Sequence, residues 1–436
     1  MPGRLASSVL PGLCALALLA PTAGCGADEP ENLGAYPLDE AVIGDSEILV
    51  HIGASRAGGG DLTIADLLRE PELALTSAPD PSLLLERQRD EHAALAPIGD
   101  GKLLRVLTYN VNLIDRWYPF TTVTGYAVDH RRVHIPPLLM SEGWDVIFFE
   151  EVFEELDVER LKLAGGLRGY RIYQGTAREH EKHGLVIAVR EELIDGEERY
   201  HERLYEFQRD VERFPGPGMA RGFLSWSFIH APTGRRIWLV GTHTTAFPDY
   251  WRERTFQARE LGLYVRERPE DDIVVVGGDF NAAPYYPEDD FGVDGGDAVG
   301  EWWRNALMYP VFLHYSGAVD AMATVLGAED VTAMQALPEF DAAAWDREPY
   351  GDAGRCDGDE LVFSWDWCNG VAFTNYSGAS EYPGRLDYIF VRDNGDAVRV
   401  LDAGLEYTDP VDLAGLETEM SDHHAVGAML QIRAGG

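Results

Sequence analysis

From residue 101 onward the sequence is built from short runs of β-branched and aromatic residues, which alternate with a few stretches of helical periodicity. Runs of this kind are typical of β-strands. The run DIVVVGGDFNAAP opens with an unbroken apolar stretch, which indicates a strand buried on both faces. Two intervening stretches, VHIPPLLMSEG and YWRERTFQARELGLYVRERP, are predicted to be helices. Many strands with few helices in one chain predict two mixed β-sheets packed face to face, with helices outside.

Polar side chains gather where these predicted strands end. A single residue of this kind is more often a cap or turn residue than a functional one. Taken together, however, they form a set of oxygen ligands and imidazoles, each placed at the tip of a separate apolar run. The set comprises Asn110, Glu150, Glu151, His243, Asp279, Asn281, Asp387, Asp422, His423 and His424.

This set of side chains suits the hydrolysis of a phosphate ester with a divalent cation. Mg²⁺ prefers oxygen ligands and is usually held by one or two carboxylates together with the substrate phosphate. Glu151 and Asn110 are the predicted ligands of Mg²⁺, or of another divalent cation such as Mn²⁺ or Co²⁺. The neighbouring Glu150 could bind a second cation, but alternation along a strand predicts that it points away from Glu151. We therefore expect one metal ion.

A general base is also needed, because water is a weak nucleophile. A histidine held by a carboxylate is the usual solution, and His423 with Asp387 is the predicted pair. His243 and Asn281 are expected to donate hydrogen bonds to the phosphoryl oxygens. Asp279 is expected to hold the attacking water or to take part in proton transfer.

Six motifs follow one another in the order TYNV, EEVF, GTH, GGDFN, RLDY and SDH, from residue 101 to about 433. This order resembles the endonuclease/exonuclease/phosphatase superfamily, whose fold is that of DNase I. The resemblance implies an α+β protein, a four-layer α/β sandwich in which two mixed β-sheets pack face to face with helices outside. It also implies a Mg²⁺ site at Glu151 and Asn110 and a base, His423, oriented by Asp387. The residues that would complete the site are Asp279, Asn281, His243 and Asp422.

Further stretches are similar to the bacterial neutral sphingomyelinases, which are secreted enzymes of the phospholipase C type. They are NVNLI before WYPF, EEVFEE before ERL, RGFLSWSF before GTH, and FSWDWCNGVAFTNYSGASEYPGRLDYIFV. This resemblance implies hydrolysis of sphingomyelin to ceramide and phosphocholine. Trp365, Asp366 and Asn369 would line the substrate cleft, although Trp365 fits the core equally well. Glu150 departs from the neutral amide that is usual at its position, and the acidic insertion has no counterpart.

The formal net charge of −38 argues against a nucleic-acid substrate, because non-specific affinity for phosphate backbones comes from Lys and Arg. Solubility or adaptation to salt explains this charge equally well. The expected partner is a phospholipid or membrane surface, with no stable nucleic-acid partner, and the protein is expected to be a monomer. Three alternatives stay open: a secreted nuclease, a phosphoinositide-type phosphatase with a basic pocket, and a non-catalytic surface module.

Residues 1–27 are predicted to be a secretory signal. Arg4 precedes an apolar stretch that is too short to span a membrane comfortably, and small residues follow it. The stretch TAGC resembles a lipoprotein cleavage box in which Cys25 would be the lipidated residue. The protein is therefore expected to be secreted or lipid-anchored at the bacterial cell envelope.

The remainder of the chain divides by composition. Residues 28–100 are interpreted as a linker or an N-terminal extension, and residues 101–433 as the catalytic domain. An insertion rich in acidic residues, glycine and aromatics is predicted at about 285–360. Cys356 and Cys368 are expected to form a disulfide in an oxidising compartment, with two free buried thiols as the alternative.

Overall fold

A computed structural model gives the fold of most of the chain from residue 82 onward. The described residues are 82–95, 98–113, 115–118, 121–124, 128–163, 167–175, 183–206, 220–246, 250–284, 306–325, 385–393, 397–407, 411–413, 416–418, 420–421 and 423–435. The predicted signal, residues 1–27 with Cys25, lies outside them, and so do Cys356 and Cys368.

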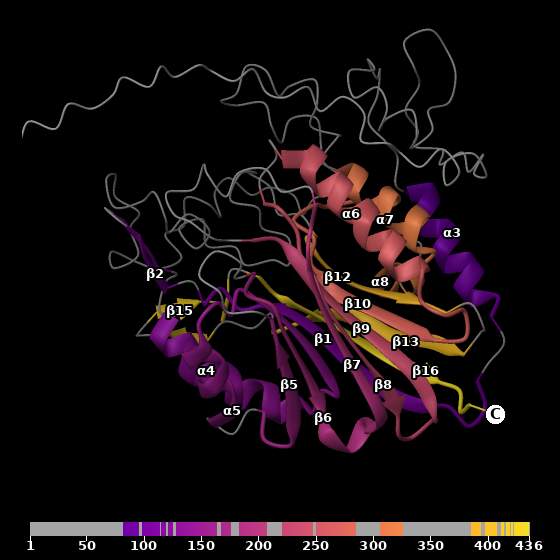
Figure 1. Cartoon of the computed structure of the whole chain (residues 1–436), viewed down its shortest axis with the longest axis horizontal. Helices are drawn as coiled ribbons and strands as arrows, with labels where there is room; N and C mark the ends of the chain where they lie inside the picture. Colours follow the sequence, from indigo (N-terminus) through magenta and orange to yellow (C-terminus); the bar gives the residue numbers. More distant parts are fainter. Residues whose placement is uncertain are drawn as a thin grey trace, which may run out of the picture. The chain divides into compact units, whose positions relative to one another are not determined.

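Two six-stranded β-sheets form the centre of the fold (Figure 1). The first sheet has the order β13-β16-β1-β4-β6-β5 and the second has the order β11-β12-β10-β9-β8-β7. In each sheet one strand pair is parallel, β1 with β4 and β9 with β10, while the other pairs are antiparallel. The prediction of two mixed sheets is therefore confirmed.

The strands have the following bounds. Those of the first sheet are β1 Lys102–Asn110, β4 Val146–Glu150, β5 Tyr170–Gln174, β6 Val186–Arg190, β13 Val398–Glu406 and β16 Ala425–Ile432. Those of the second are β7 Ile194–Leu204, β8 Gly222–His230, β9 Arg235–His243, β10 Ile273–Asp279, β11 Val319–Asp320 and β12 Asp387–Arg392. Two small hairpins are made by β2 Asp115–Tyr118 with β3 Thr121–Thr124, and by β14 Val411–Leu413 with β15 Leu416–Thr418.

Helices cover the outer faces of both sheets (Figure 1). They are α3 Ser82–Ala93, α4 Val128–Glu142, α5 Glu155–Leu163, α6 Trp251–Arg266, α7 Met308–Ser316 and α8 Ala321–Val325, with a short 3₁₀ helix at Glu191–Leu193. Helices α4 and α5 share a buried apolar cluster with the outer face of the first sheet. On the second sheet, Arg392 of β12 donates hydrogen bonds to backbone carbonyls at the end of α6. The two helices predicted from the sequence correspond to α4 and α6.

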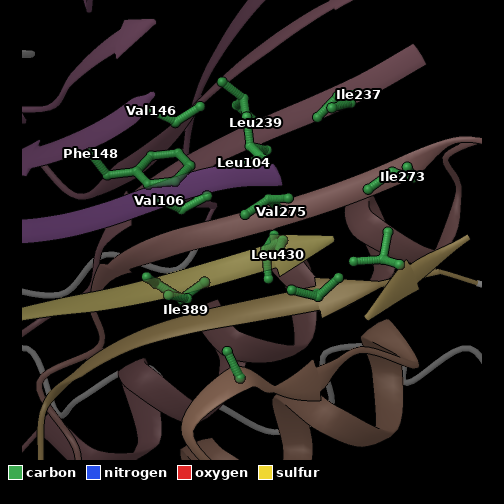
Figure 2. Close-up of a cluster of buried hydrophobic side chains, with 14 of the residues drawn as sticks. Leu104, Val106, Val146, Phe148, Ile237, Leu239, Ile273, Val275, Ile389 and Leu430 are labelled. Carbon is green, nitrogen blue, oxygen red and sulfur yellow. The ribbon is translucent and has the colours of Figure 1, made fainter. Parts of the chain in front are cut away.

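Alternate side chains of the strands point into the space between the sheets and form one apolar core (Figure 2). Val106, Phe148, Leu239, Val275 and Ile389 belong to this inner core and are almost fully buried. On β1 and β4 the residues in between pack instead against the helices. The two-residue period of a strand thus decides which side chains lie between the sheets.

The ring of Phe148 occupies the place where the two sheets approach each other closely. A Cβ atom on Gly277 would lie 2.2 Å from Cδ2 of this ring, and one on Gly241 would lie 3.2 Å from Cδ1. Both glycines lie on the inner face of the second sheet. The absence of a side chain at these two positions lets the aromatic ring fit between the sheets.

Residues 306–325 fall within the stretch predicted as an insertion, yet they are part of the sandwich. Strand β11 pairs with β12, and α7 packs its aromatic side chains on the same strand. The ring of Phe312 lies 4.6 Å from that of Phe390 and 5.2 Å from that of Phe280, between centroids. This segment therefore covers the outer face of the strand that carries Asp387.

Helix α3 is joined to the sandwich by hydrogen bonds from several elements. The side chain of Gln88 donates to the Tyr309 hydroxyl at 3.2 Å and accepts from the Asp320 backbone amide at 2.8 Å. His92 donates to the carbonyl of Val400, and Arg399 donates to the carbonyl of His92. Part of the predicted N-terminal extension thus packs on the second sheet and on the edge of the first. None of the described helices is long and apolar enough to cross a membrane.

Replacing Gly277 with alanine is expected to lower the free energy of unfolding by about 1–3 kcal/mol, because the new methyl group would overlap the Phe148 ring. Urea denaturation measures this loss. The same replacement in a Phe148→Leu background should cost less, since the shorter side chain leaves space. An equal loss in both backgrounds would contradict the packing argument.

A second prediction concerns acid stability. His230 is buried at the end of β8, bonded through Nδ1 to Thr233, and burial lowers its pKa to about 4. In the unfolded chain the His230 imidazole is protonated below about pH 6.5, whereas in the folded chain it stays neutral until the pH approaches 4. The free energy of unfolding therefore falls as the pH drops from 6.5 toward 4. Between pH 7 and pH 5 the expected contribution is about 2 kcal/mol. In a His230→Asn variant, urea unfolding at both pH values should show a smaller drop, and an unchanged drop would exclude His230 as its source.

Candidate active site

The polar residues predicted at strand ends meet at one end of the sandwich, at the next inward-facing position along the strands after Phe148. Two positions after Phe148 on β4 comes Glu150, and two positions after Gly277 on β10 comes Asp279. Asp279 stands directly opposite His243 of β9 and Asp387 of β12 in the second sheet. The alternation that buries the inner core therefore also turns these side chains into the space between the sheets.

His423 and Asp387 form a buried hydrogen-bonded pair. Nδ1 of His423 lies 2.7 Å from Oδ2 of Asp387, and both residues are buried. Because an ionised carboxylate only accepts hydrogen bonds, Nδ1 donates and Nε2 is left as the basic nitrogen. Nε2 lies 3.9 Å from Oδ2 of Asp279 and so faces the rest of the site. This is the arrangement that the sequence predicted for a general base.

Asp279 connects the other polar groups of the site. Its Oδ2 accepts a hydrogen bond from Nδ2 of Asn110 at 3.0 Å and lies 3.3 Å from Nε2 of His243. Its Oδ1 accepts from the backbone amide of Asn281 at 2.8 Å. The side chain of Asn281 donates to the carbonyl of Thr244 at 3.1 Å and is partly exposed. Three predicted site residues, Asn110, His243 and Asn281, are thus brought together around the Asp279 carboxylate.

His243 is held as a neutral imidazole. Burial, followed by the positive charge of Arg221 and by His423 and His183, moves the pKa of His243 well below its usual value. Its Nδ1 is buried and has no hydrogen-bond partner within the described part of the chain. A neutral imidazole of this kind can donate one hydrogen bond from Nε2 without adding charge to the site.

Glu151 and Asn110, the predicted metal ligands, lie at the ends of two neighbouring strands of the first sheet, β4 and β1. Glu151 follows directly after β4 in a left-handed backbone conformation, with φ of 64°, and is partly exposed. The side-chain oxygen of Asn110 accepts the backbone amide of Asn112 at 3.1 Å. Burial lowers the pKa of Arg221, while the negative charges of Glu151 and Asp279 act in the opposite direction.

Glu150 lies two positions after Phe148 on β4 and so faces the space between the sheets, as strand alternation predicts. It is fully buried, and its Oε1 accepts a hydrogen bond from Thr108 at 3.1 Å. Burial, and then the charges of Asp387 and Asp279, raise the pKa of Glu150 well above the usual value of a glutamic acid. Strand alternation was applied correctly to Glu150, but Glu151 lies beyond the strand end.

The donors in this site fit a divalent cation. Asp279, Asp387 and His423 each offer one ligand atom, and these three atoms lie within 4.8 Å of one another. Oxygen atoms of carboxylates and amides predominate, as hard cations such as Mg²⁺ require. Sequence reasoning included Glu150 among the polar residues at strand ends but assigned it no role, and it did not single out Arg221. The counting of alternate positions from Phe148 could have found Glu150, whereas no sequence signal distinguishes Arg221.

Several predicted residues lie outside the described part of the chain. They are Asp422, the proposed cleft residues Trp365, Asp366 and Asn369, the cysteines Cys356 and Cys368, and Cys25. Their roles stay predictions.

Comparison with known families gives one match that spans most of the chain. The model of the Endonuclease/Exonuclease/phosphatase family matches residues 107–423. This range begins inside β1 and ends at His423, so it contains every described site residue. No curated protein matches the chain.

Solved structures with a similar arrangement include TDP2 of D. rerio in complex with single-strand DNA product, at 18% identity and a TM-score of 0.47. That match covers 76% of this chain and 99% of the other. A family protein from Bacteroides thetaiotaomicron has 17% identity and a TM-score of 0.46, covering 77% and 99%. Beta toxin from Staphylococcus aureus has 15% identity and a TM-score of 0.44, covering 74% and 99%.

Proposed function

The chain belongs to the endonuclease/exonuclease/phosphatase family, and from this premise we propose that it is a divalent-cation-dependent phosphodiesterase acting on phospholipid head groups. The observation that carries the proposal is the buried pair of His423 and Asp387. This pair faces Asp279 at the end of the sandwich where the polar strand ends meet. Family members are generally hydrolases of phosphate esters, and this pair supplies the base that such hydrolysis needs.

In the proposed reaction His423 takes the proton of the attacking water at Nε2. Asp387 fixes the orientation of the imidazole and stabilises its charged form, since their hydrogen bond persists when the ring gains a proton. His243 donates a hydrogen bond to a phosphoryl oxygen, and Asn281 contributes a second, uncharged donor. A divalent cation held by Glu151 and Asn110 would polarise the phosphoryl oxygen and offset its growing negative charge.

The proposed substrate is sphingomyelin, which would be cleaved to ceramide and phosphocholine. The net charge of −38 supports a zwitterionic head group, because a strongly acidic surface repels a polyanionic substrate. The Trp-Asp stretch around Trp365 also supports this substrate through its resemblance to bacterial sphingomyelinases. Mg²⁺ is the proposed cation, and the protein is proposed to act as a monomer on a membrane surface.

The purified mature protein is expected to release phosphocholine from sphingomyelin in mixed liposomes when Mg²⁺ is present, and to release none after EDTA treatment. Release from phosphatidylcholine in parallel vesicles measures the preference for the lipid backbone, because both lipids carry the phosphocholine head group. Plasmid DNA under the same conditions tests the rival function. Nicked plasmid with intact lipid would identify the protein as a nuclease and reject the proposed substrate.

Two variants serve as controls for this assay. His423→Ala should lower turnover by about 10²–10⁴-fold through loss of the base, with folding preserved because His423 lies at the end of the sandwich and outside the inner core. Glu151→Gln should abolish activity, and added Mg²⁺ should not restore it, because a proposed ligand of the cation is lost. Circular dichroism confirms that each variant is folded. Full activity in both would reject the proposed mechanism.

We further propose that the protein is exported, which the character of residues 1–27 supports. Expressed with these residues in a bacterial host, the protein should be found outside the cytoplasm with its N-terminus cleaved near Cys25. A Cys25→Ser variant distinguishes the two routes, because only a lipid-anchored protein would lose its attachment to membranes. An uncleaved protein in the cytoplasm would contradict export.

A further inference from the structure

The backbone at Glu151, a proposed ligand of the cation, is held in a conformation that a glutamate rarely adopts. Its φ of 64° lies in the left-handed region, which costs free energy for a residue with a side chain and persists only where the surroundings impose it. Hydrogen bonds hold the chain on both sides of this residue. Before it, the backbone amide of Val111 donates to the carbonyl of Glu150 at 3.2 Å. After it, the amide of Val152 donates to the carbonyl of Gly184 at 2.9 Å, so the segment around Gly184 fixes the far side of the turn.

The conformation of Gly184 depends in turn on the side chain of His183. Gly184 is itself left-handed, with φ of 68°. The imidazole of His183 closes the turn around it, because Nδ1 accepts a hydrogen bond from the backbone amide of Leu185 at 3.3 Å. A ring nitrogen that accepts carries no proton, so the proton is on Nε2, which donates it to Oε1 of Glu202 at 2.7 Å. One imidazole thus joins this turn of the first sheet to a carboxylate on β7 of the second sheet.

The ring of His183 is enclosed by backbone. The side chain is almost fully buried, and a Cβ atom on Gly175 would lie 2.0 Å from its Cε1. The amide of Gly175 donates to the carbonyl of Leu185 at 3.3 Å, so the chain after β5 and the chain before β6 are joined beside the ring. A Cβ atom on Gly184 would lie 2.8 Å from the ring of Phe153. Because the turn is packed against its neighbours in this way, a displacement of His183 is expected to move the residues that follow β4.

We propose that His183, held by Glu202, is a positioning residue for Glu151. In this role it does not bind the cation itself but holds the backbone from which the Glu151 carboxylate projects. The hydrogen-bonded path runs from Glu202 through His183 and the carbonyl of Gly184 to the amide of Val152. A ligand whose backbone is fixed in advance binds a metal more tightly, because less conformational entropy is lost on binding. The inference rests on the proposed function, in which Glu151 is a ligand of the cation.

Variants of Glu202 and His183 separate the effect of the hydrogen bond from the effect of charge. Glu202→Ala removes the acceptor of the His183 proton, whereas Glu202→Gln removes the charge and keeps an acceptor oxygen. His183→Asn keeps an acceptor for the amide of Leu185 but is too short to reach Glu202. Glu197→Ala is the matched control, because Glu197 is an exposed carboxylate on the same strand and pairs with Arg199 instead.

Isothermal titration of the purified protein with Mn²⁺ measures the effect on the cation site. The Kd for Mn²⁺ should rise by about tenfold in Glu202→Ala and in His183→Asn, as is usual when a group that orients a metal ligand is lost. Glu202→Gln and Glu197→Ala should keep the wild-type Kd. A residue that only stabilises the fold would lower the melting temperature and leave the Kd unchanged. Glu202 is partly exposed, so Glu202→Ala decides the question if His183→Asn does not fold.

Amide hydrogen exchange without metal gives a second measurement on the same variants. The amide of Val152 should exchange faster in Glu202→Ala than in the wild-type protein, because its acceptor, the carbonyl of Gly184, is less firmly held. In Glu202→Gln and Glu197→Ala the exchange of this amide should be unchanged. This measurement reports on the turn itself and does not depend on a bound cation or on a substrate.

An unchanged Kd in Glu202→Ala would overturn the inference. An equal rise in Glu202→Gln would also overturn it, since the charge and not the hydrogen bond would then be responsible. These results differ from a failure of the proposed function. Weaker Mn²⁺ binding in Glu202→Ala, without lipid hydrolysis by the wild-type protein, would uphold the positioning role and reject the substrate. A wild-type protein that binds no Mn²⁺ would reject the proposed metal site and the inference with it.

Discussion

The register of β10 against its two neighbours is the constraint on which the site depends. Backbone hydrogen bonds place Asp279 opposite His243 on one side and opposite Asp387 on the other. A shift of β10 by one residue would turn Asp279 to the other face of the sheet, away from His243 and Asp387. The apolar residues earlier in the same strands prevent such a shift, because it would expose the inner core. Packing far from the site therefore sets the positions of its polar groups.

Much of this arrangement could be predicted from the sequence, because strand ends and apolar runs leave local signals. The two mixed sheets, helix α6, and the pairing of His423 with Asp387 all follow from such signals. Glu150 follows from counting alternate positions after Phe148, whereas Glu151 lies beyond the strand end in a left-handed conformation, for which a glutamate has no special preference. Arg221 lies near the site through tertiary packing alone, and its sequence neighbourhood does not indicate this.

The segment 306–325 illustrates a different limit of sequence reasoning. Acidic and glycine-rich stretches flank it, so composition averaged over 285–360 predicts an insertion. Its aromatic residues nevertheless pack on β12, and Asp320 accepts hydrogen bonds from Tyr309 and the guanidinium of Arg385 in the interior. A short apolar element inside a polar stretch is recognised only when its partners are known. In this protein those partners lie on β12 and, through Gln88, on α3.

The central place of β1 in the first sheet has a consequence for biosynthesis. This strand, near the beginning of the described chain, is bonded on one side to β4 and on the other to β16, close to the end. While the polypeptide is still emerging from the ribosome, β1 lacks one neighbour, and His423 with the final strand has not yet been made. Contacts so distant in sequence form slowly, because a long loop must close first. The complete site therefore forms only after both His423 and β16 have been synthesised.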